Sequence, residues 1–165
     1  EQALPGHRIH IEEIPATDRT MSHWATALIG KPWRYGAQGP DEFDCWGFVR
    51  FVQREYYEVN LPDVLVPDTW PAVRKLLEHH EEHKRWNKVE APDDGDIVMM
   101  ARNKIPVHVG IALRANNTQG VLHCFEPSGV VFQPYASLRI GGWGGLTFTG
   151  EHYAHRKPIA APAAR

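Results

Sequence analysis

The chain has 165 residues, which is enough for one domain with a buried core and too few for two such domains. Its net charge of −2 and its 42% hydrophobic residues are typical of a globular protein and argue against a nucleic-acid partner. No apolar run is as long as a membrane span, and the first residues lack the layout of a secretory signal, so we expect no membrane partner.

The first predicted elements are a helix and a loop. We expect an N-terminal arm at 1–19, one domain at 20–156 and a flexible tail at 157–165. Within the domain, the apolar residues of DRTMSHWATALIG recur at helical spacing, and Gly30 is a natural helix stop. The next segment, KPWRYGAQGPDEF, contains two prolines and two glycines, which predicts a structured loop.

A second helix is predicted in DCWGFVRFVQREYYEV. Asp44 is a favourable N-cap, Cys45 falls on the apolar face, and Pro62 lies beyond the helix end. A proline-rich connector then leads to a third helical pattern, AVRKLLEHHEEHKRW, whose outer face is highly charged.

After the third helical pattern, apolar and polar residues alternate, which predicts strands. ANNTQG, between the second and third strands, predicts a hairpin turn. Helices followed by a run of neighbouring strands indicate an α+β fold with an antiparallel sheet of about five strands. The five segments are DIVMMAR, VHVGIALR, GVLHCFEP, GVVFQPY and GLTFTGEHYAHR.

Cys45 is the first candidate for a reactive group. A thiol attacks a carbonyl as its thiolate, and the N–H groups at a helix start lower the pKa of a thiol. The position of Cys45 directly after the predicted N-cap therefore suits a nucleophile. Two other interpretations stay open, namely a small buried hydrophobe and a disulfide with Cys124.

Two histidines are candidates for the base that a thiol nucleophile needs. His108 shares a strand face with Gly110 and Ala112, which leaves room beside it, and His123 lies on the next strand. A hairpin turn near Asn117 would bring the two histidines together. A structural role for either histidine is the alternative.

The sequence resembles the NlpC family of papain-like cell-wall cysteine peptidases over residues 20–135. The resemblance rests on GKPWRYGAQGPDEFDCWGFVRFVQ, DDGDIVMM and VHVGIALRANNTQGVLHCFEPSGVV, which occur in the order of the family pattern. It implies a papain-like fold with N-terminal helices packed on the sheet. It also implies that Cys45 is the nucleophile, that His108 is the base, and that His123 orients the base. The backbone N–H of Cys45 would help stabilise the oxyanion, and neither a metal nor an organic cofactor would be needed.

The resemblance also implies a substrate and a setting. Family members typically hydrolyse amide bonds in peptidoglycan stem peptides, often between D-glutamate and a diamino acid. The tryptophan after the cysteine resembles members from phage tails and prophages, which open the host wall locally. We therefore expect phage tail proteins as further partners and a location in the virion tail, or in the bacterial periplasm or cell wall.

Two residues depart from the family pattern at positions that help to hold the stem peptide. Trp46 stands where serine is usual, and Trp33 stands where tyrosine is usual. Asp44 is retained to meet an amine, and Tyr35 could supply a hydroxyl, although packing under the loop is the favoured interpretation of Tyr35. Asp44, Trp33, Tyr35 and Trp46 are therefore the candidate substrate-binding residues.

Other patterns favour structural interpretations. His79 and His83 are at helical spacing, but EHHEEHK lacks the metalloprotease spacing and is better explained as a solvated helix face. GGWGG predicts a turn. Trp70 and Trp86 flank the third helical pattern, where core packing is favoured over a glycan groove.

Two other functions stay open at this point. The first is a weakly active or inactive structural or adaptor protein of a phage tail tip, which the departures at Trp33 and Trp46 favour. The second is a related amidase or acyltransferase that uses the same thiol.

Overall fold

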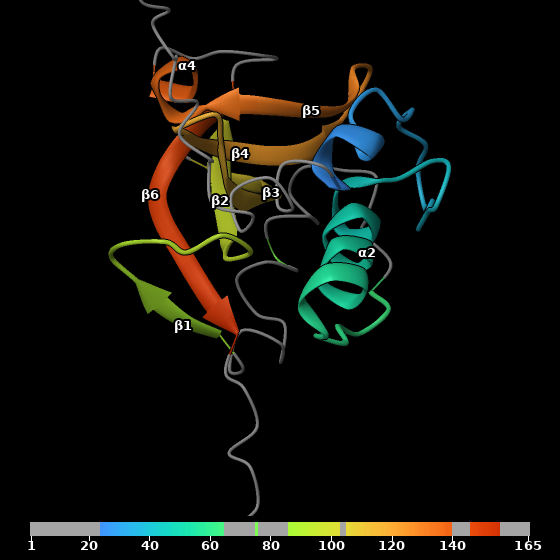
Figure 1. The fold of residues 1–165 in the computed structure, drawn as a ribbon, viewed down its shortest axis with the longest axis horizontal. Helices are drawn as coiled ribbons and strands as arrows, with labels where there is room; N and C mark the ends of the chain where they lie inside the picture. The colour runs from blue at the N-terminus through green and yellow to red at the C-terminus, as the bar shows by residue number, and fades with distance from the viewer. Residues whose placement is uncertain (1–23, 65–74, 76–85, 103–104, 140–145, 156–165) are drawn as a thin grey trace, which may run out of the picture.

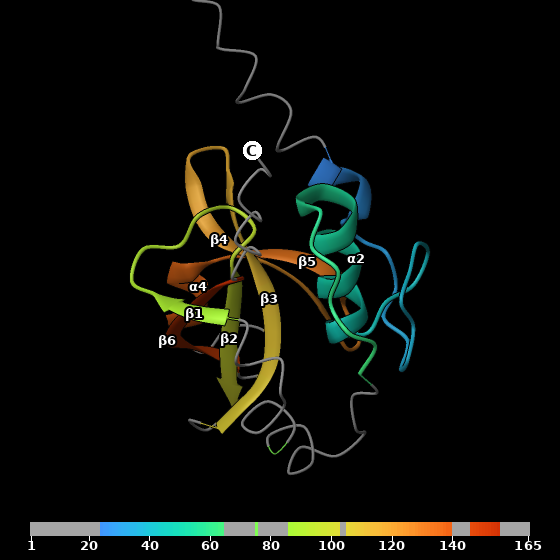
Figure 2. The ribbon, with the colours of Figure 1, turned by 90° about the horizontal axis from the view of Figure 1, so that it is seen from below.

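The computed structural model describes residues 24–64, 75, 86–102, 105–139 and 146–155. The predicted arm, most of the third helical pattern, Trp70, GGWGG and the C-terminal tail lie outside the described residues, and the domain bounds stay a prediction. In the described part, helix α2 (Cys45–Tyr57) packs against strands β3 and β4 on one side of an antiparallel sheet (Figures 1 and 2). The predicted α+β fold is confirmed. No helix in the described ranges is long and apolar enough to cross a membrane.

The sheet has six strands in the order β1-β6-β2-β3-β4-β5, and every neighbouring pair is antiparallel. The five predicted strands are all present. The sixth strand, β1, begins at Trp86, which the sequence pattern assigned to the end of the third helix, so that assignment is wrong. The strands are β1 (Trp86–Val89), β2 (Ile97–Arg102), β3 (Ile105–Ala115), β4 (Thr118–Phe125), β5 (Gly129–Pro134) and β6 (Leu146–His155).

The helices follow from local signals. Asp44 caps α2 by accepting a hydrogen bond from the N–H of Gly47, and the helix ends at Glu58, whose φ of 57° is left-handed. Residues 24–28 are helical and stop at Gly30, which has a φ of 86°. A short helix that the sequence did not predict, α4 (Tyr135–Arg139), follows β5 (Figure 1).

The predicted hairpin between β3 and β4 is confirmed. Asn116 and Asn117 both have positive φ, 48° and 62°, as a two-residue turn of type I′ requires, and Ala115 pairs with Thr118 across it. The tight turn fixes the register of the two histidine-bearing strands.

The largest cluster of buried hydrophobic residues lies between α2 and the sheet. Phe48, Val49 and Val52 of the helix are fully buried against the sheet. Trp86 is also part of this core, as the sequence favoured, with 9% of its surface exposed. The strand residues of this core are Ile97, Met99, Val109, Ile111, Leu113, Leu122, Cys124 and Val130. This packing holds the start of α2 against the middle of the sheet.

Candidate active site

The cysteine is the first residue of α2, and a buried carboxylate fixes the backbone around it. Asp44 is 8% exposed, and its two oxygens accept hydrogen bonds from the N–H groups of Gly47, at 2.6 Å, and Gly36, at 3.1 Å. The N–H of Asp44 donates to the carbonyl of Ala37 at 2.8 Å. Loop and helix start are therefore tied together on both sides of Cys45.

Gly47 is needed for this approach of loop and helix. A Cβ atom at residue 47 would lie 2.2 Å from the carbonyl oxygen of Ala37 and 3.0 Å from Oδ1 of Asp44. Any side chain would therefore push the loop away from the first turn of α2. The glycine that follows Cys45 and Trp46 therefore allows the loop to pack closely on the start of α2.

The environment of Cys45 corrects one expectation from the sequence. Burial, followed by the charge of Asp44, raises the pKa of the Cys45 thiol to about 12. The backbone N–H groups of Trp46 and Cys45 lower it, as a helix start should, but they do not offset the loss of hydration. The helix start therefore does not lower the pKa of Cys45 by itself, and a thiolate there needs a base that removes the proton.

The structure brings the two predicted histidines together. Nε2 of His108 lies 2.9 Å from Nδ1 of His123, and the two side chains are almost fully buried. Gly110 leaves the space for this contact, because a Cβ there would lie 2.9 Å from the Cβ of His123. The paired register of β3 and β4 ends at Ile111 and Leu122, whereas β4 stays paired with β5 as far as Phe125. The imidazoles therefore meet where β3 and β4 part.

A third side chain, Gln133, extends this contact and was missed in the sequence. Its Oε1 lies 2.7 Å from Nε2 of His123, and Gln133 is 2% exposed. In the register of β4 and β5, Val131 is the partner of His123, so Gln133 is its diagonal neighbour on the same side of the sheet. A lone polar residue inside the apolar strand GVVFQP was the available signal.

The three side chains fix the direction of their hydrogen bonds. The Oε1 of Gln133 can only accept, so His123 donates from its Nε2–H. Burial, partly opposed by the hydrogen bond to Gln133, lowers the pKa of His123 to about 4, so this imidazole is neutral at neutral pH. Its Nδ1 then accepts from the Nε2–H of His108. In neutral His108, the proton is consequently on Nε2 and the lone pair is on Nδ1.

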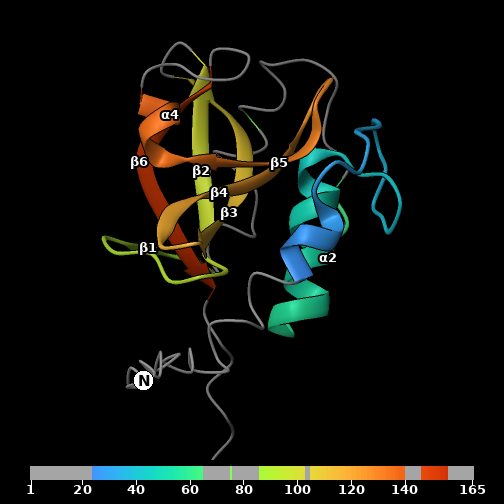
Figure 3. The same ribbon diagram turned by 45° about the horizontal axis from the view of Figure 1, so that its top comes forward.

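The start of α2 and the histidine-bearing end of β4 are in contact. The thiol of Cys124, next to His123 in the chain, donates to the carbonyl of Phe43 at 3.3 Å, and Phe43 precedes Asp44 and Cys45. Figures 1 and 3 both show α2 on the side of the sheet where β4 ends and β5 begins. Cys45 and Cys124 are both free thiols, so the alternative of a disulfide between them is not realised.

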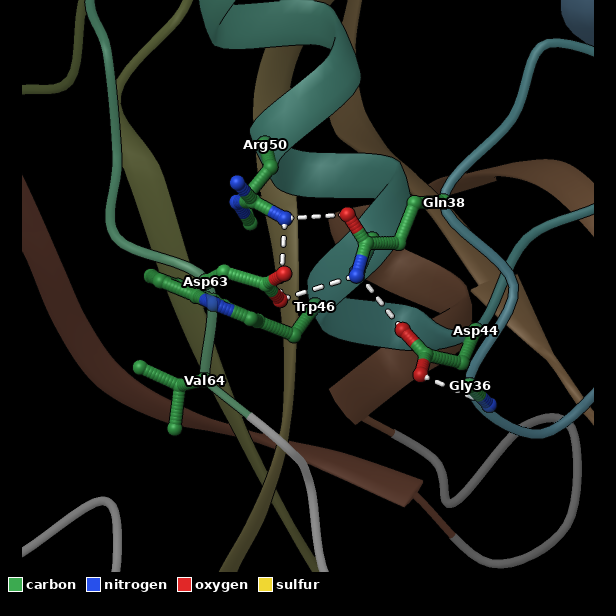
Figure 4. Close-up of a pocket in the computed structure, with 8 residues that line it drawn as sticks. Gly36, Gln38, Asp44, Trp46, Arg50, Asp63 and Val64 are labelled. Atoms are coloured by element: carbon green, nitrogen blue, oxygen red, sulfur yellow. Dashed lines mark hydrogen bonds and ion pairs between the residues drawn. The ribbon is translucent and has the colours of Figure 1, made fainter.

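A small pocket opens beside the first turn of α2 (Figure 4). Asp44 and Trp46, two of the four predicted substrate-binding residues, line it. Trp33 is instead partly buried against the core, and Tyr35 is 45% exposed, so packing under the loop is the wrong interpretation of Tyr35. The full lining is Gly36, Gln38, Asp44, Trp46, Gly47, Arg50, Asp63 and Val64.

One wall of this pocket is an extended segment held on α2 by polar contacts that the sequence did not reveal. The indole N–H of Trp46 donates to the carbonyl of Pro62 at 3.2 Å. Arg50 donates to the carbonyl of Leu61 at 3.2 Å and forms an ion pair with Asp63 at 3.1 Å (Figure 4). Trp46 thus anchors the pocket wall in addition to lining the pocket.

The sequence did not favour a metal site at His79 and His83. His79 and His83 lie outside the described residues. Within the part of the chain that the structure describes, no group of three or more His, Cys, Asp or Glu side chains is placed to hold a metal ion.

The chain is similar to solved structures that are distantly related in sequence. The NlpC/p60 domain of the peptidoglycan hydrolase SagA matches with a TM-score of 0.50 and 20% identity, over 85% of this chain and 98% of that one. NlpC2 from Trichomonas vaginalis matches with a TM-score of 0.49 and 16% identity, over 82% of this chain and 45% of that one. An N-acetylmuramoyl-L-alanine amidase from Bacteroides uniformis matches with a TM-score of 0.47 and 13% identity, over 85% and 99% of the two chains.

No curated protein sequence matches the chain. The model of the NlpC/P60 family matches residues 30–140, which include the loop, α2, the histidine-bearing hairpin and Gln133. The chain therefore belongs to the NlpC/P60 family.

Proposed function

We propose that this chain is a cysteine peptidase that hydrolyses amide bonds in peptidoglycan stem peptides. The observation that carries the proposal is the hydrogen-bonded arrangement of Gln133, His123 and His108, together with the contact of strand β4 with the chain just before a helix that begins with a cysteine. Membership in the NlpC/P60 family supports a peptidoglycan substrate. The fold shared with the NlpC/p60 domain of the peptidoglycan hydrolase SagA agrees with it.

The first half of the reaction uses the lone pair on Nδ1 of His108. The S–H bond of Cys45 breaks as its proton moves to this nitrogen, and the sulfur attacks the carbonyl carbon of the scissile amide. The backbone N–H of Cys45, at the helix start, stabilises the oxyanion that develops. His123 stays neutral and accepts the Nε2–H of the His108 imidazolium.

The second half restores the thiol. His108 gives the Nδ1 proton to the leaving amine nitrogen as the C–N bond breaks, which leaves a thioester on Cys45. Water then attacks the thioester with His108 as the base, the carboxylic acid leaves, and the proton returns to sulfur. No step needs a metal or an organic cofactor.

The pocket beside the first turn of α2 supports recognition of a small charged group. Asp44 points its carboxylate at this pocket and is already held by two backbone N–H groups, so an arriving ammonium would meet an ordered acceptor. This suits the free amine of a short stem peptide and cleavage after D-glutamate, before a diamino acid. The resemblance of DCWGFVR to phage-tail members further supports a role in local wall opening by a phage or prophage tail.

Incubation of purified sacculi and defined stem peptides with wild type and Cys45→Ala, followed by mass spectrometry, tests the proposal. We expect products with wild type and none with Cys45→Ala at an unchanged fold, since alanine has no nucleophile. Cys124→Ala is the matched control, because it removes the second free thiol, which is not the proposed nucleophile, and should keep the activity. Equal product from wild type and Cys45→Ala would refute the cysteine mechanism.

A second candidate function is a tail-tip structural or adaptor protein with little activity. The observation that favours it is the indole of Trp46, which is engaged by Pro62 where the family usually has serine. The rate of Cys45 alkylation by iodoacetamide in wild type and His108→Gln separates the two functions. Slow alkylation that does not depend on residue 108 would favour the structural role.

A further inference from the structure

We propose that Gln133 is a positioning residue, whose side-chain oxygen fixes the proton arrangement of both histidines so that His108 presents its lone pair at Nδ1. This inference rests on the proposed function, because it assigns Gln133 a part in activating the base. No part of the resemblance in the sequence points to residue 133. The argument starts from the contact between Gln133 and His123.

The oxygen, and not the amide nitrogen, of Gln133 has to face His123 for the reaction to proceed. During the reaction His108 is an imidazolium, which carries a proton on each ring nitrogen and therefore needs an acceptor at Nε2. That acceptor is Nδ1 of His123, 2.9 Å away. If the amide nitrogen faced His123, the proton of His123 would move to Nδ1 and point at the Nε2–H of His108. An oxygen at residue 133 removes this conflict.

The neutral charge of the glutamine matters as well. A carboxylate at residue 133 would be as good an acceptor, but its charge would favour protonation of His123. A protonated His123 donates from its Nδ1 to Nε2 of His108. The proton of neutral His108 then has to be on the Nδ1 of His108, the nitrogen that must carry a lone pair for His108 to act as the base. A neutral oxygen therefore supplies the acceptor while His123 stays an acceptor towards His108.

Among the described residues, the side-chain amide of Gln133 has a hydrogen-bond partner at one of its two ends, so its contribution to stability is incomplete. Its Nε2 is buried and has no hydrogen-bond partner among the described residues. An unpaired buried donor is costly, so a glutamine retained for structure alone would be expected to pair both ends. The single satisfied contact is the one that reaches His123.

Three variants test this inference. Gln133→Met keeps the shape and removes the acceptor, and Gln133→Glu keeps the acceptor and adds a charge. Gln53→Met is the matched control, because Gln53 is an equally buried glutamine whose Nε2 donates to the carbonyl of Gly95, away from both histidines. The readouts are the ¹⁵N NMR shifts of the histidine rings at pH 7, and kcat and KM on a defined stem peptide between pH 4 and pH 9.

In wild type we expect both histidines to carry their proton on Nε2. Gln133→Met should shift His123 to a mixture of tautomers and lower kcat by roughly tenfold to a hundredfold with KM within about twofold, as for other outer residues that orient a histidine. Gln133→Glu should move the acidic limb of the kcat profile to higher pH. Gln53→Met should change the melting temperature without changing the tautomers or the pH profile.

The outcomes separate this inference from the proposed function. Unchanged tautomers in Gln133→Met, or a loss of kcat no larger than that of Gln53→Met, would overturn the role of Gln133. If the wild-type chain releases no product, or if Cys45→Ala still does, the peptidase proposal fails, and the NMR arm still decides whether residue 133 sets the protons of the histidines.

Discussion

The two sides of the candidate site differ in the charge of their side chains. On the loop and helix side, a carboxylate at Asp44 and an ion pair between Arg50 and Asp63 border a pocket that is open to solvent. On the sheet side, His123 and Gln133 are neutral and 0% and 2% exposed. Asp44 is itself only 8% exposed and is held by two backbone N–H groups, whereas the groups that orient the base are neutral, which avoids the cost of burying a charge. The variants below test this division.

The largest effect is expected from the base itself. His108→Gln removes the nitrogen that takes the thiol proton, while the thiol of Cys45 keeps its raised pKa, so the thiolate should no longer form. We expect kcat to fall by about a hundredfold to ten-thousandfold. Single-turnover hydrolysis of a defined stem peptide measures this, with circular dichroism as the control for folding. Activity within about threefold of wild type would remove His108 from the mechanism.

The next effect concerns the neutral state of the sheet side. Between pH 4 and 6.5 the unfolded chain binds a proton at His123, whereas the folded chain does not. The free energy of unfolding should therefore rise with pH across this window, by on the order of 3 kcal/mol from this residue. The rise should be complete above pH 6.5.

Urea unfolding of wild type and His123→Asn at several pH values isolates this contribution. The asparagine oxygen replaces Nδ1 as the acceptor for His108 and does not titrate, so the variant should lose the slope and retain part of the activity. Identical slopes in the two proteins would contradict a buried, neutral His123.

The smallest effect is expected on the charged side. Asp44→Ala removes the helix cap and should lower the free energy of unfolding by about 1 kcal/mol, whereas Asp44→Asn keeps an acceptor for Gly47 and should cost less. Both variants should raise KM for a stem peptide with a free amine. An unchanged KM in Asp44→Asn would show that the carboxylate does not meet the substrate.

The sequence was sufficient where local patterns decide the structure. The cap at Asp44, the stop at Gly30 and the turn at Asn116 and Asn117 each depend on one or two residues, and all three are present. The assignment of Trp86 failed because it sits at the junction of a helical pattern and a short edge strand, where pairing with β6 decides the outcome.

The candidate site was only partly predictable for the same reason. The closeness of His108 and His123 follows from strand alternation and a short turn. The partnership of Gln133 requires the register of β4 and β5, which the sequence pattern does not specify. The predicted lowering of the Cys45 pKa was wrong in direction, because the position of a residue at a helix start contains no information about its burial. Contacts of Trp46 and Arg50 with residues 61–63 depend on how an irregular segment folds back.

The hairpin register has a consequence for how the protein folds. His108, His123 and Gln133 are supplied by strands β3, β4 and β5, which are neighbours in both sequence and space, so they come together through short loop closures that cost little chain entropy. The thiol-bearing helix comes from a distant part of the sequence and joins through side-chain packing. A displacement of α2 would therefore separate sulfur from imidazole and leave the three-residue arrangement intact. Substitutions in the core beneath α2 would then abolish the activity, while the ¹⁵N NMR shifts of the histidine rings stayed unchanged.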